Sequence, residues 1–190
     1  MRPLPLTPSQ TIGPFFHALV RDDHRVLVSD ATLGERIRLE GRVFDNDGAI
    51  VPDALIEIWQ ANAAGRYDHS ADRSDAPLDP AFHGFGRAAT DDDGIYWFET
   101  IKPGAVAFTG TQRQAPHINL TIHARGLLNH LSTRAYFADE PATATDPILD
   151  LVPEHRRATL IAKRENSANG VTYRLDIILS GTGETVFLDF

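Results

Sequence analysis

Short runs of alternating apolar and polar residues, separated by turn-forming clusters, constrain the fold of this chain more than any other feature. A period of two places every second side chain on one face, as in a half-buried β-strand. The runs cover residues 37–44, 54–59, 86–90, 95–100, 117–123, 159–164, 171–180 and 185–190. Clusters such as Asp45-Asn46-Asp47-Gly48 and Asp91-Asp92-Asp93-Gly94 join neighbouring runs and are typical of hairpin turns. We therefore predict an all-β fold, an antiparallel β-sandwich.

Two long stretches, residues 3–30 and 62–83, lack the strand pattern. Loops longer than about 12 residues in a compact domain are usually functional or docked on another chain, so we expect function or assembly there. Residues 154–158 predict one helical turn. A chain of 190 residues is long enough for one core and short for two domains. We predict a single domain over residues 1–190, with a β-sandwich core over residues 31–190.

Composition excludes several classes of function. No stretch approaches the roughly 18 apolar residues of a membrane span, and the N-terminus lacks the apolar core of a secretory signal, so we expect a cytoplasmic protein without a membrane partner. A net charge of −8 repels phosphate backbones and argues against nucleic acid as a partner. Without cysteine, any metal ligands must come from the eight histidines or from Asp, Glu, Tyr and Asn.

Two motifs with a chemical interpretation are better explained as structure. Residues 84–89 match the dinucleotide fingerprint, but a strand and a hairpin follow where that motif requires a helix. The three aspartates before Gly94 are ordinary turn residues. A serine hydrolase is also disfavoured, because no serine lies in a G-x-S-x-G elbow.

The expected strand over residues 117–123 has one apolar and one polar face. Alternation places His117, Asn119 and His123 on the polar face. A histidine in such a position is more often a hydrogen-bonded structural residue than a metal ligand, and the pattern alone leaves both interpretations open.

The order and spacing of several motifs resemble the intradiol dioxygenase family. They are Thr7-Pro8-Ser9-Gln10-Thr11, Trp59-Gln60-Ala61, Gly65-Arg66-Tyr67, Ala76-Pro77-Leu78-Asp79-Pro80, Phe85-Gly86-Arg87, Thr100-Ile101-Lys102-Pro103-Gly104, Pro116-His117-Ile118 and Leu160-Ile161-Ala162-Lys163-Arg164. The resemblance covers nearly the whole chain. Some enzymes of this family are built from two homologous chains, α and β, and the tail Gly183-Glu184-Thr185-Val186-Phe187 resembles the α type.

The resemblance implies a metal site that is incomplete in this chain. Catalytic chains of the family hold ferric iron with two tyrosines and two histidines. Tyr67 and His117 match the first of each pair, whereas Val106 and Asn119 stand at the second positions. Valine has no donor atom and an amide is a weak ligand for Fe(III), so we expect no metal in this chain and a structural role for the vestigial Tyr67 and His117.

The resemblance also implies a function shared with a partner. A homologous β chain would bind Fe(III) and cleave protocatechuate (3,4-dihydroxybenzoate) with O2 to 3-carboxy-cis,cis-muconate. This chain would dock its N-terminal segment, residues 1–30, on that partner and close the substrate pocket. The implied pocket residues are Thr11, Gly13, Pro14, Phe15 and Arg134. An arginine suits the substrate's carboxylate, and glycine followed by proline suits a preformed loop against a flat ring.

Two rival hypotheses remain open at this point. The same β-sandwich without a metal could be a non-catalytic binding or scaffold module for small aromatic ligands. A self-sufficient enzyme with an unusual ligand set is a further alternative, against which Val106 and Asn119 argue.

Overall fold

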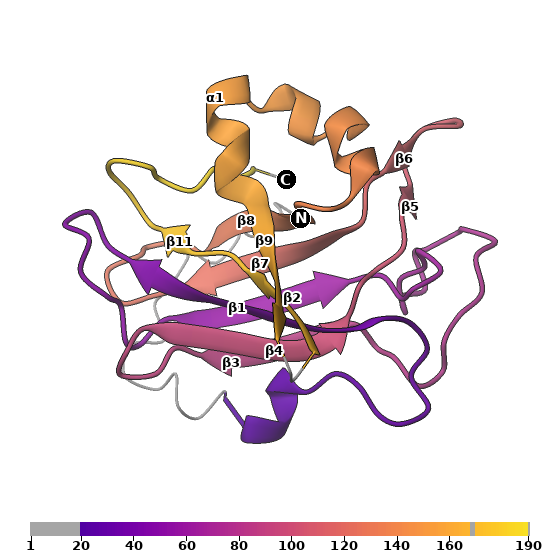
Figure 1. Ribbon diagram of the computed structural model, residues 1–190, viewed down its shortest axis with the longest axis horizontal. Helices are drawn as coiled ribbons and strands as arrows, with labels where there is room; N and C mark the ends of the chain where they lie inside the picture. Colours follow the sequence, from indigo (N-terminus) through magenta and orange to yellow (C-terminus); the bar gives the residue numbers. More distant parts are fainter. Residues whose placement is uncertain (1–19, 168–169, 190) are drawn as a thin grey trace, which may run out of the picture.

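The computed structural model describes residues 20–167 and 170–189, and strands dominate them (Figure 1). The strands are β1 (Arg36–Phe44), β2 (Leu55–Gln60), β3 (Phe85–Ala89), β4 (Ile95–Ile101), β5 (Val106–Ala107), β6 (Arg113–Gln114), β7 (His117–His123), β8 (Leu131–Phe137), β9 (Ile161–Ser167), β10 (Gly170–Arg174) and β11 (Ile177–Ile178). The helical turns are η2 (Asp22–Arg25), η3 (Pro141–Thr145), η4 (Leu149–Leu151), α1 (Glu154–Arg157) and η5 (Ala158–Leu160). The predicted all-β fold and the helical turn near residue 154 are confirmed.

Strand pairing is mixed rather than purely antiparallel as predicted. β1 runs parallel to β10 and β11, and β8 runs parallel to β9, whereas the other neighbours are antiparallel. The reason lies in the connections. β8 reaches β9 through the helical turns η3 to η5, and a crossover of this length lets successive strands point the same way. The alternating pattern fixes which face a side chain occupies, not which strand lies beside it.

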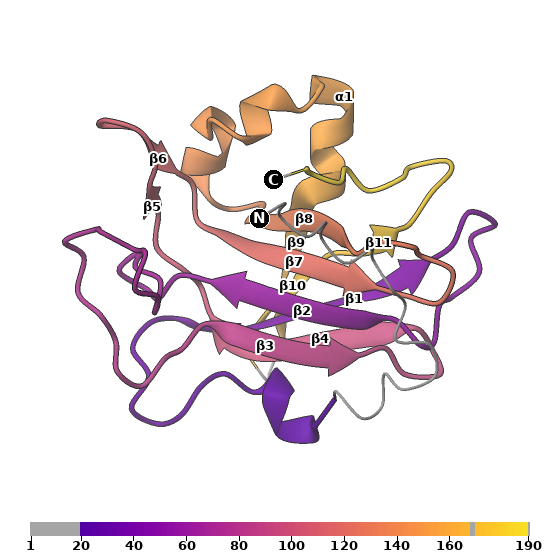
Figure 2. The same cartoon turned by 180° about the vertical axis from the view of Figure 1, so that it is seen from behind.

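One apolar core lies between the two halves of the curled sheet, which Figures 1 and 2 show from opposite sides. One half has the order β4-β1-β10-β9 and the other β3-β2-β7-β8, and they join where β8 pairs with β9. The core includes the fully buried Phe98, Ile58 and Leu120, one from each of β4, β2 and β7. Burial of each such side chain contributes roughly 2 kcal/mol.

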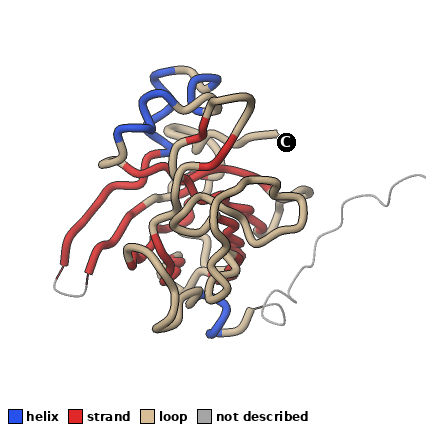
Figure 3. Tube along the Cα trace, turned by 90° about the vertical axis from the view of Figure 1, so that its right-hand side faces the viewer, coloured by secondary structure: helices blue, strands red, loops and turns tan. Residues whose placement is uncertain are grey.

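While η2 lies on one side of the sheet, below β3 and β4, the other helical turns gather on the opposite side, above β8 (Figures 1 and 3). They enclose a second, smaller core around Tyr136, Leu149, Leu160 and Val186. β5 and β6 form a separate two-stranded hairpin beside the main sheet (Figure 1). Within the described residues, no helix is long and apolar enough to cross a membrane.

Two sequence predictions differ from the structure at the C-terminal end. The predicted strand over residues 171–180 is divided into β10 and β11. Residues 185–189 form no strand, although Thr185 and Leu188 donate backbone hydrogen bonds to Ile178 and Ser132. These isolated hydrogen bonds connect residues 185–189 to the sheet edge, but they do not form the continuous pairing that defines a strand. The long loop predicted over residues 62–83 is confirmed, since it contains neither helix nor strand.

Candidate functional site

The polar face of β7 is the foundation of the candidate site. Its burial alternates as predicted, and Ile118 and Leu120 point into the core. Asn119 lies opposite Trp59 on β2 and opposite Arg134 on β8. Directly opposed residues of paired strands project from the same face, so these three side chains gather beside His117.

A tight turn after β2 brings Tyr67 to this face. The side-chain oxygen of Asn62 accepts the backbone N–H groups of Ala64 and Arg66, each at 3.0 Å. Gly65 adopts a left-handed φ of 84°, and a Cβ there would collide with the carbonyl oxygen of Ala105. Only glycine lets the turn approach β5 so closely, which explains why the Gly65-Arg66-Tyr67 motif places its tyrosine beside Val106.

Tyr67, His117 and Asn119 form one hydrogen-bonded cluster. The Tyr67 hydroxyl lies 3.3 Å from Nε2 of His117 and accepts Nδ2 of Asn119 at 3.1 Å. Nδ1 of His117 lies 2.7 Å from the carbonyl oxygen of Ala115, which can only accept, so Nδ1 bears the proton. Nε2 is therefore the acceptor for the phenol. The structure thus joins three of the four positions that the family resemblance had matched to metal ligands.

Both titratable members of this cluster are neutral near pH 7. Burial and, secondarily, the positive charge of Arg134 lower the pKa of His117 to about 4. Burial raises the pKa of Tyr67, and the hydrogen bond from Asn119 offsets only part of this rise. A neutral phenol donating to a neutral imidazole is the arrangement that these shifts favour.

Arg134 holds its charge in the interior, with 7% of its surface exposed. Its Nε donates to Oδ1 of Asn119 at 3.1 Å, and its Nη1 donates to Oε1 of Gln114 at 2.7 Å. Nη1 also lies 3.4 Å from the hydroxyl of Tyr136. These bonds fix the guanidinium beside the Tyr67 cluster, on the same face of the sheet.

The buried Asp146 stabilises this hydrogen-bond network through Tyr136. Its carboxylate is 1% exposed and accepts the Tyr136 hydroxyl at 2.9 Å. It also accepts the backbone N–H groups of Ala115 at 2.7 Å and Leu149 at 2.8 Å. Burial raises the pKa of Tyr136, which keeps its hydroxyl protonated as the donor to Asp146. The carboxylate therefore ties the second core to the strand that holds His117.

These residues do not fit a ferric ion. The oxygen of Asn119 is bonded to Arg134, the free nitrogen of His117 faces the Tyr67 phenol, and Val106 has no donor atom. A fixed guanidinium next to the cluster repels a further cation. Moreover, across residues 20–167 and 170–189 no group of three or more His, Cys, Asp or Glu side chains could hold a metal ion.

A cavity of about 670 Å³ opens in front of this cluster, between the 62–83 loop and the β5–β6 hairpin. Trp59 and Tyr67 form one wall, with ring centroids 5.6 Å apart and planes 20° from parallel. Val106, Gln114 and Arg134 also line it. The cavity therefore combines stacked aromatic rings with a buried positive charge.

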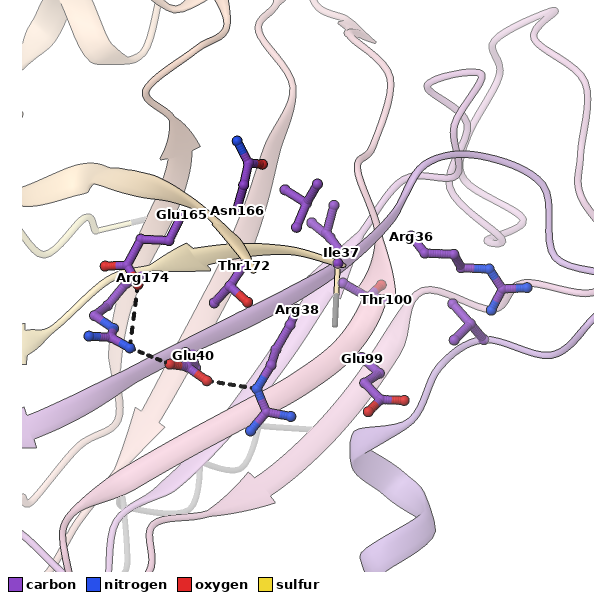
Figure 4. Close-up of a pocket in the computed structure, with 13 residues that line it drawn as sticks. Arg36, Ile37, Arg38, Glu40, Glu99, Thr100, Glu165, Asn166, Thr172 and Arg174 are labelled. Atoms are coloured by element: carbon purple, nitrogen blue, oxygen red, sulfur yellow. Dashed lines mark hydrogen bonds and ion pairs between the residues drawn. The ribbon is translucent and has the colours of Figure 1, made fainter. Parts of the chain in front are cut away.

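A second groove, drawn in Figure 4, is a weaker candidate. There Glu40 binds Nε of Arg38 at 2.6 Å and Nη2 of Arg174 at 2.7 Å, and Arg174 also lies 3.6 Å from Glu165. Burial alone would raise the pKa of Glu40, but the hydrogen bonds from Arg38 and Arg174 lower it overall. These four charged side chains of the groove are paired with one another within β1 and between neighbouring strands, as in a structural ion-pair network.

The structure can be compared with the predicted residues one by one. Tyr67, His117, Asn119, Val106 and Arg134 are brought together at one cavity and its floor. Thr11, Gly13, Pro14 and Phe15 lie outside the described residues.

Sequence reasoning missed Gln114, Tyr136 and Asp146, which hold Arg134 and His117 in place. The position of Tyr136 directly opposite His117 could have been found only from the pairing of β7 with β8.

Comparison with known proteins gives consistent results. A family model described as "Dioxygenase" matches residues 12–181. The protocatechuate 3,4-dioxygenase alpha chain of Pseudomonas putida is 45% identical over 202 residues, covering 98% of this chain and 98% of that protein. The protocatechuate 3,4-dioxygenase beta chain of Burkholderia cepacia is 39% identical over 188 residues, covering 95% of this chain and 78% of that protein. The dioxygenase domain of a carbohydrate-binding fusion protein from Streptomyces sp. SirexAA-E has a TM-score of 0.63 and 26% identity, covering 93% of this chain and 99% of that one.

Proposed function

This chain belongs to the intradiol dioxygenase family, and from that premise we propose that it is the α-type chain of a two-chain protocatechuate 3,4-dioxygenase. Full-length similarity to an alpha chain, and lower similarity to a beta chain, support the assignment. The observation that supports it most is the cluster around Tyr67. All four matched ligand positions are near one another, yet two side chains cannot ligate iron and a buried arginine lies beside them.

In this proposal the homologous β chain holds Fe(III), and the bound metal acts as a Lewis acid toward the catechol. The ring of protocatechuate is cleaved with O2 to 3-carboxy-cis,cis-muconate. This chain contributes shape and charge. Residues 1–30 dock on the β chain, and Thr11, Gly13, Pro14, Phe15 and Arg134 line the substrate pocket at the interface. The complex works in the cytoplasm.

The scaffold for this role is a single domain over residues 1–190, with the halves of the curled sheet serving as the two layers of a β-sandwich over residues 31–190. Rigid strands suit a chain whose task is to position a loop, because residues on a sheet move less than residues on a flexible loop. The remaining sequence-based alternative is a binding or scaffold module for small aromatic ligands, which needs no β chain.

Co-expression distinguishes these functions. The tagged chain is produced alone and together with a family member that has both tyrosines and both histidines, and O2 uptake is measured with protocatechuate. We expect a stable two-chain complex that consumes O2, and no uptake by this chain alone. If no complex forms and this chain alone binds aromatic compounds without O2 uptake, the binding-module function replaces our proposal.

The predicted role of Arg134 has its own test in the complex. Removing the guanidinium with Arg134→Ala raises the KM for protocatechuate, because the carboxylate loses its cationic partner. Arg174→Ala, which removes an arginine of the ion-paired groove, is the matched control and leaves the KM unchanged. An unchanged KM in Arg134→Ala contradicts the predicted contact across the interface.

A further inference from the structure

The curled sheet has two end strands, β3 and β4. Within the described residues β3 pairs with β2 and β4 pairs with β1, and neither is paired with a further named strand on its other side. The two end strands lie beside each other, with η2 below both (Figures 1 and 2). Soluble proteins commonly cover the free edges of such strands, because an exposed edge pairs readily with other chains.

Residues 24–27 connect the two end strands. The backbone N–H of Leu27 donates to the carbonyl oxygen of Glu99 on β4 at 2.9 Å, and Val26 forms a parallel bridge with the same residue. The side chain of Leu27 is half-buried and packs against the main core. The segment is therefore bound to the edge of β4 through its backbone and to the interior through one apolar side chain.

Gly86 on β3 provides the space for this contact. A Cβ at Gly86 would lie 2.6 Å from Cδ1 of Leu27 and 3.1 Å from the carbonyl oxygen of His24. Both distances are shorter than ordinary van der Waals contact, which begins at about 3.5 Å. Gly86 is not among the glycines with a positive φ, so the close approach of the 24–27 segment, and not the backbone conformation, requires glycine here. This gives the glycine of the Phe85-Gly86-Arg87 motif a physical role.

Trp97 binds the same segment on the outer face of β4. The guanidinium carbon of Arg25 lies 4.7 Å from the centre of the Trp97 ring, and that of Arg38 on β1 lies 4.2 Å from it. A cation over an indole face is attracted by the ring's quadrupole, and tryptophan gives the strongest contact of this kind. Arg25 thus adds a contact with a side chain of β4 to the backbone contact made by Leu27.

We propose that Gly86 and Trp97 are positioning residues for assembly of the two-chain enzyme. They hold residues 24–27 on their own sheet and so fix the point at which the N-terminal segment joins it. This inference rests on the proposed function, in which residues 1–30 dock on the β chain, and it assigns the partner contacts to the residues that precede the 24–27 segment. Fixing this point before binding reduces the conformational entropy that the N-terminal segment loses on docking.

Gly86→Val is the first test. Valine favours strands, so β3 itself accepts it, but its methyl groups occupy the space of Leu27. Fewer molecules then hold the 24–27 segment in place, and the apparent Kd for the β chain rises in proportion. We expect a Kd about tenfold higher by analytical ultracentrifugation, and faster hydrogen exchange of the Leu27 amide in the lone chain. Wild-type assembly by a folded Gly86→Val overturns the proposal.

Arg25→Gln is the second test, and it remains decisive if circular dichroism shows that Gly86→Val is unfolded. Loss of the cation over Trp97 should raise the Kd for the β chain about threefold. Arg25→Lys restores a cation and should assemble like the wild type, a rescue that a general loss of stability would not give. The matched control is Arg21→Gln, since Arg21 is exposed and paired with Asp23 at 3.2 Å. Equal Kd values for Arg25→Gln and Arg21→Gln overturn the proposal.

Failure of this inference is distinguishable from failure of the proposed function. A wild-type chain that forms no complex with the β chain contradicts the proposed function, and the inference falls with it before any variant is made. If the wild type assembles and Gly86→Val and Arg25→Gln assemble equally well, the proposed function stands and only the role of Gly86 and Trp97 in assembly is overturned.

Discussion

Two arginines of this protein, Arg134 on β8 and Arg174 on β10, occupy polar clusters of opposite character. Arg134 is 7% exposed and donates to neutral side chains. The side chain of Arg174 is 49% exposed and pairs with the carboxylates of Glu40 and Glu165 (Figure 4). The cavities beside them have the same size, about 670 Å³ each, so volume does not separate a candidate site from an ordinary surface groove.

Burial and the chemistry of the partners do separate them. Exposed ion pairs contribute little, because water screens the charges and long side chains lose entropy when fixed. A buried charge is strongly coupled to its surroundings, and removing any member of its network is expensive. The cluster around Arg134 should therefore respond strongly to small substitutions, whereas the groove around Arg174 should respond weakly.

The largest effect is expected at Asp146. Asp146→Ala removes the acceptor of one hydroxyl and several backbone N–H groups in the interior, and each buried donor left unsatisfied costs about 1–3 kcal/mol. We expect a loss of about 3 kcal/mol or more in the free energy of unfolding, measured with urea. The control is Asp176→Ala, an exposed carboxylate that accepts the N–H of Arg42, with a loss below about 1 kcal/mol. Similar losses in both variants would contradict the expected difference between a buried and an exposed carboxylate.

A pH effect of comparable size is expected from His117. Its pKa is lowered from 6.5 to about 4 in the folded protein, so the folded state stays neutral while the unfolded chain takes up a proton below about pH 6.5. Stability is thus fully present above that pH and falls by up to about 3 kcal/mol as the pH drops toward 4. Glutamine takes up no proton in this pH range, so the unfolding free energy of His117→Gln should fall less over the same window. Parallel pH profiles of the two proteins would be inconsistent with a buried neutral imidazole.

A smaller effect is expected at Tyr67. Tyr67→Phe removes the hydroxyl that joins His117 to Asn119 but keeps the ring stacked on Trp59. Asn119 retains its bond to the carbonyl oxygen of Trp59, so we expect a loss of about 1 kcal/mol in urea unfolding. No loss would mean that the hydroxyl is equally well satisfied by water.

The smallest effect on the free energy of unfolding is expected at Glu40, in the groove around Arg174. Glu40→Gln removes both of its ion pairs, and we expect a loss below about 1 kcal/mol at low salt that disappears at about 1 M salt. A loss of several kcal/mol that persists in salt would show that the exposed groove is as tightly coupled as the buried cluster.

Much of the fold follows from local pattern, and its failures have physical causes. Alternation predicts β1 and β7 well because one face of each is buried and the other is not. It does not predict β8, in which five consecutive residues are buried on both faces, or the parallel pairing across the helical crossover. Residues 185–189 have a strand-like pattern but find only isolated hydrogen-bond partners at the sheet edge.

The candidate site, like the fold, was predicted only in part. Tyr67, Val106, His117 and Asn119 were found through resemblance to a family, since no local rule distinguishes a vestigial ligand from a structural histidine. Gln114 and Asp146 leave no signal in the sequence, because their contacts depend on the register of β7 with β8 and on the crossover that follows. Burial of the arginine is likewise a property of the folded sheet.

The most direct test of the central claim is metal analysis with a visible spectrum, made on this chain alone and on its complex with a β chain. Our account predicts that the lone chain is colourless and free of iron, because a phenol, an imidazole, an amide and a valine beside a guanidinium do not hold Fe(III). The complex should contain iron and show tyrosinate-to-iron charge-transfer absorption. Stoichiometric iron and ring cleavage in the lone chain would contradict the account.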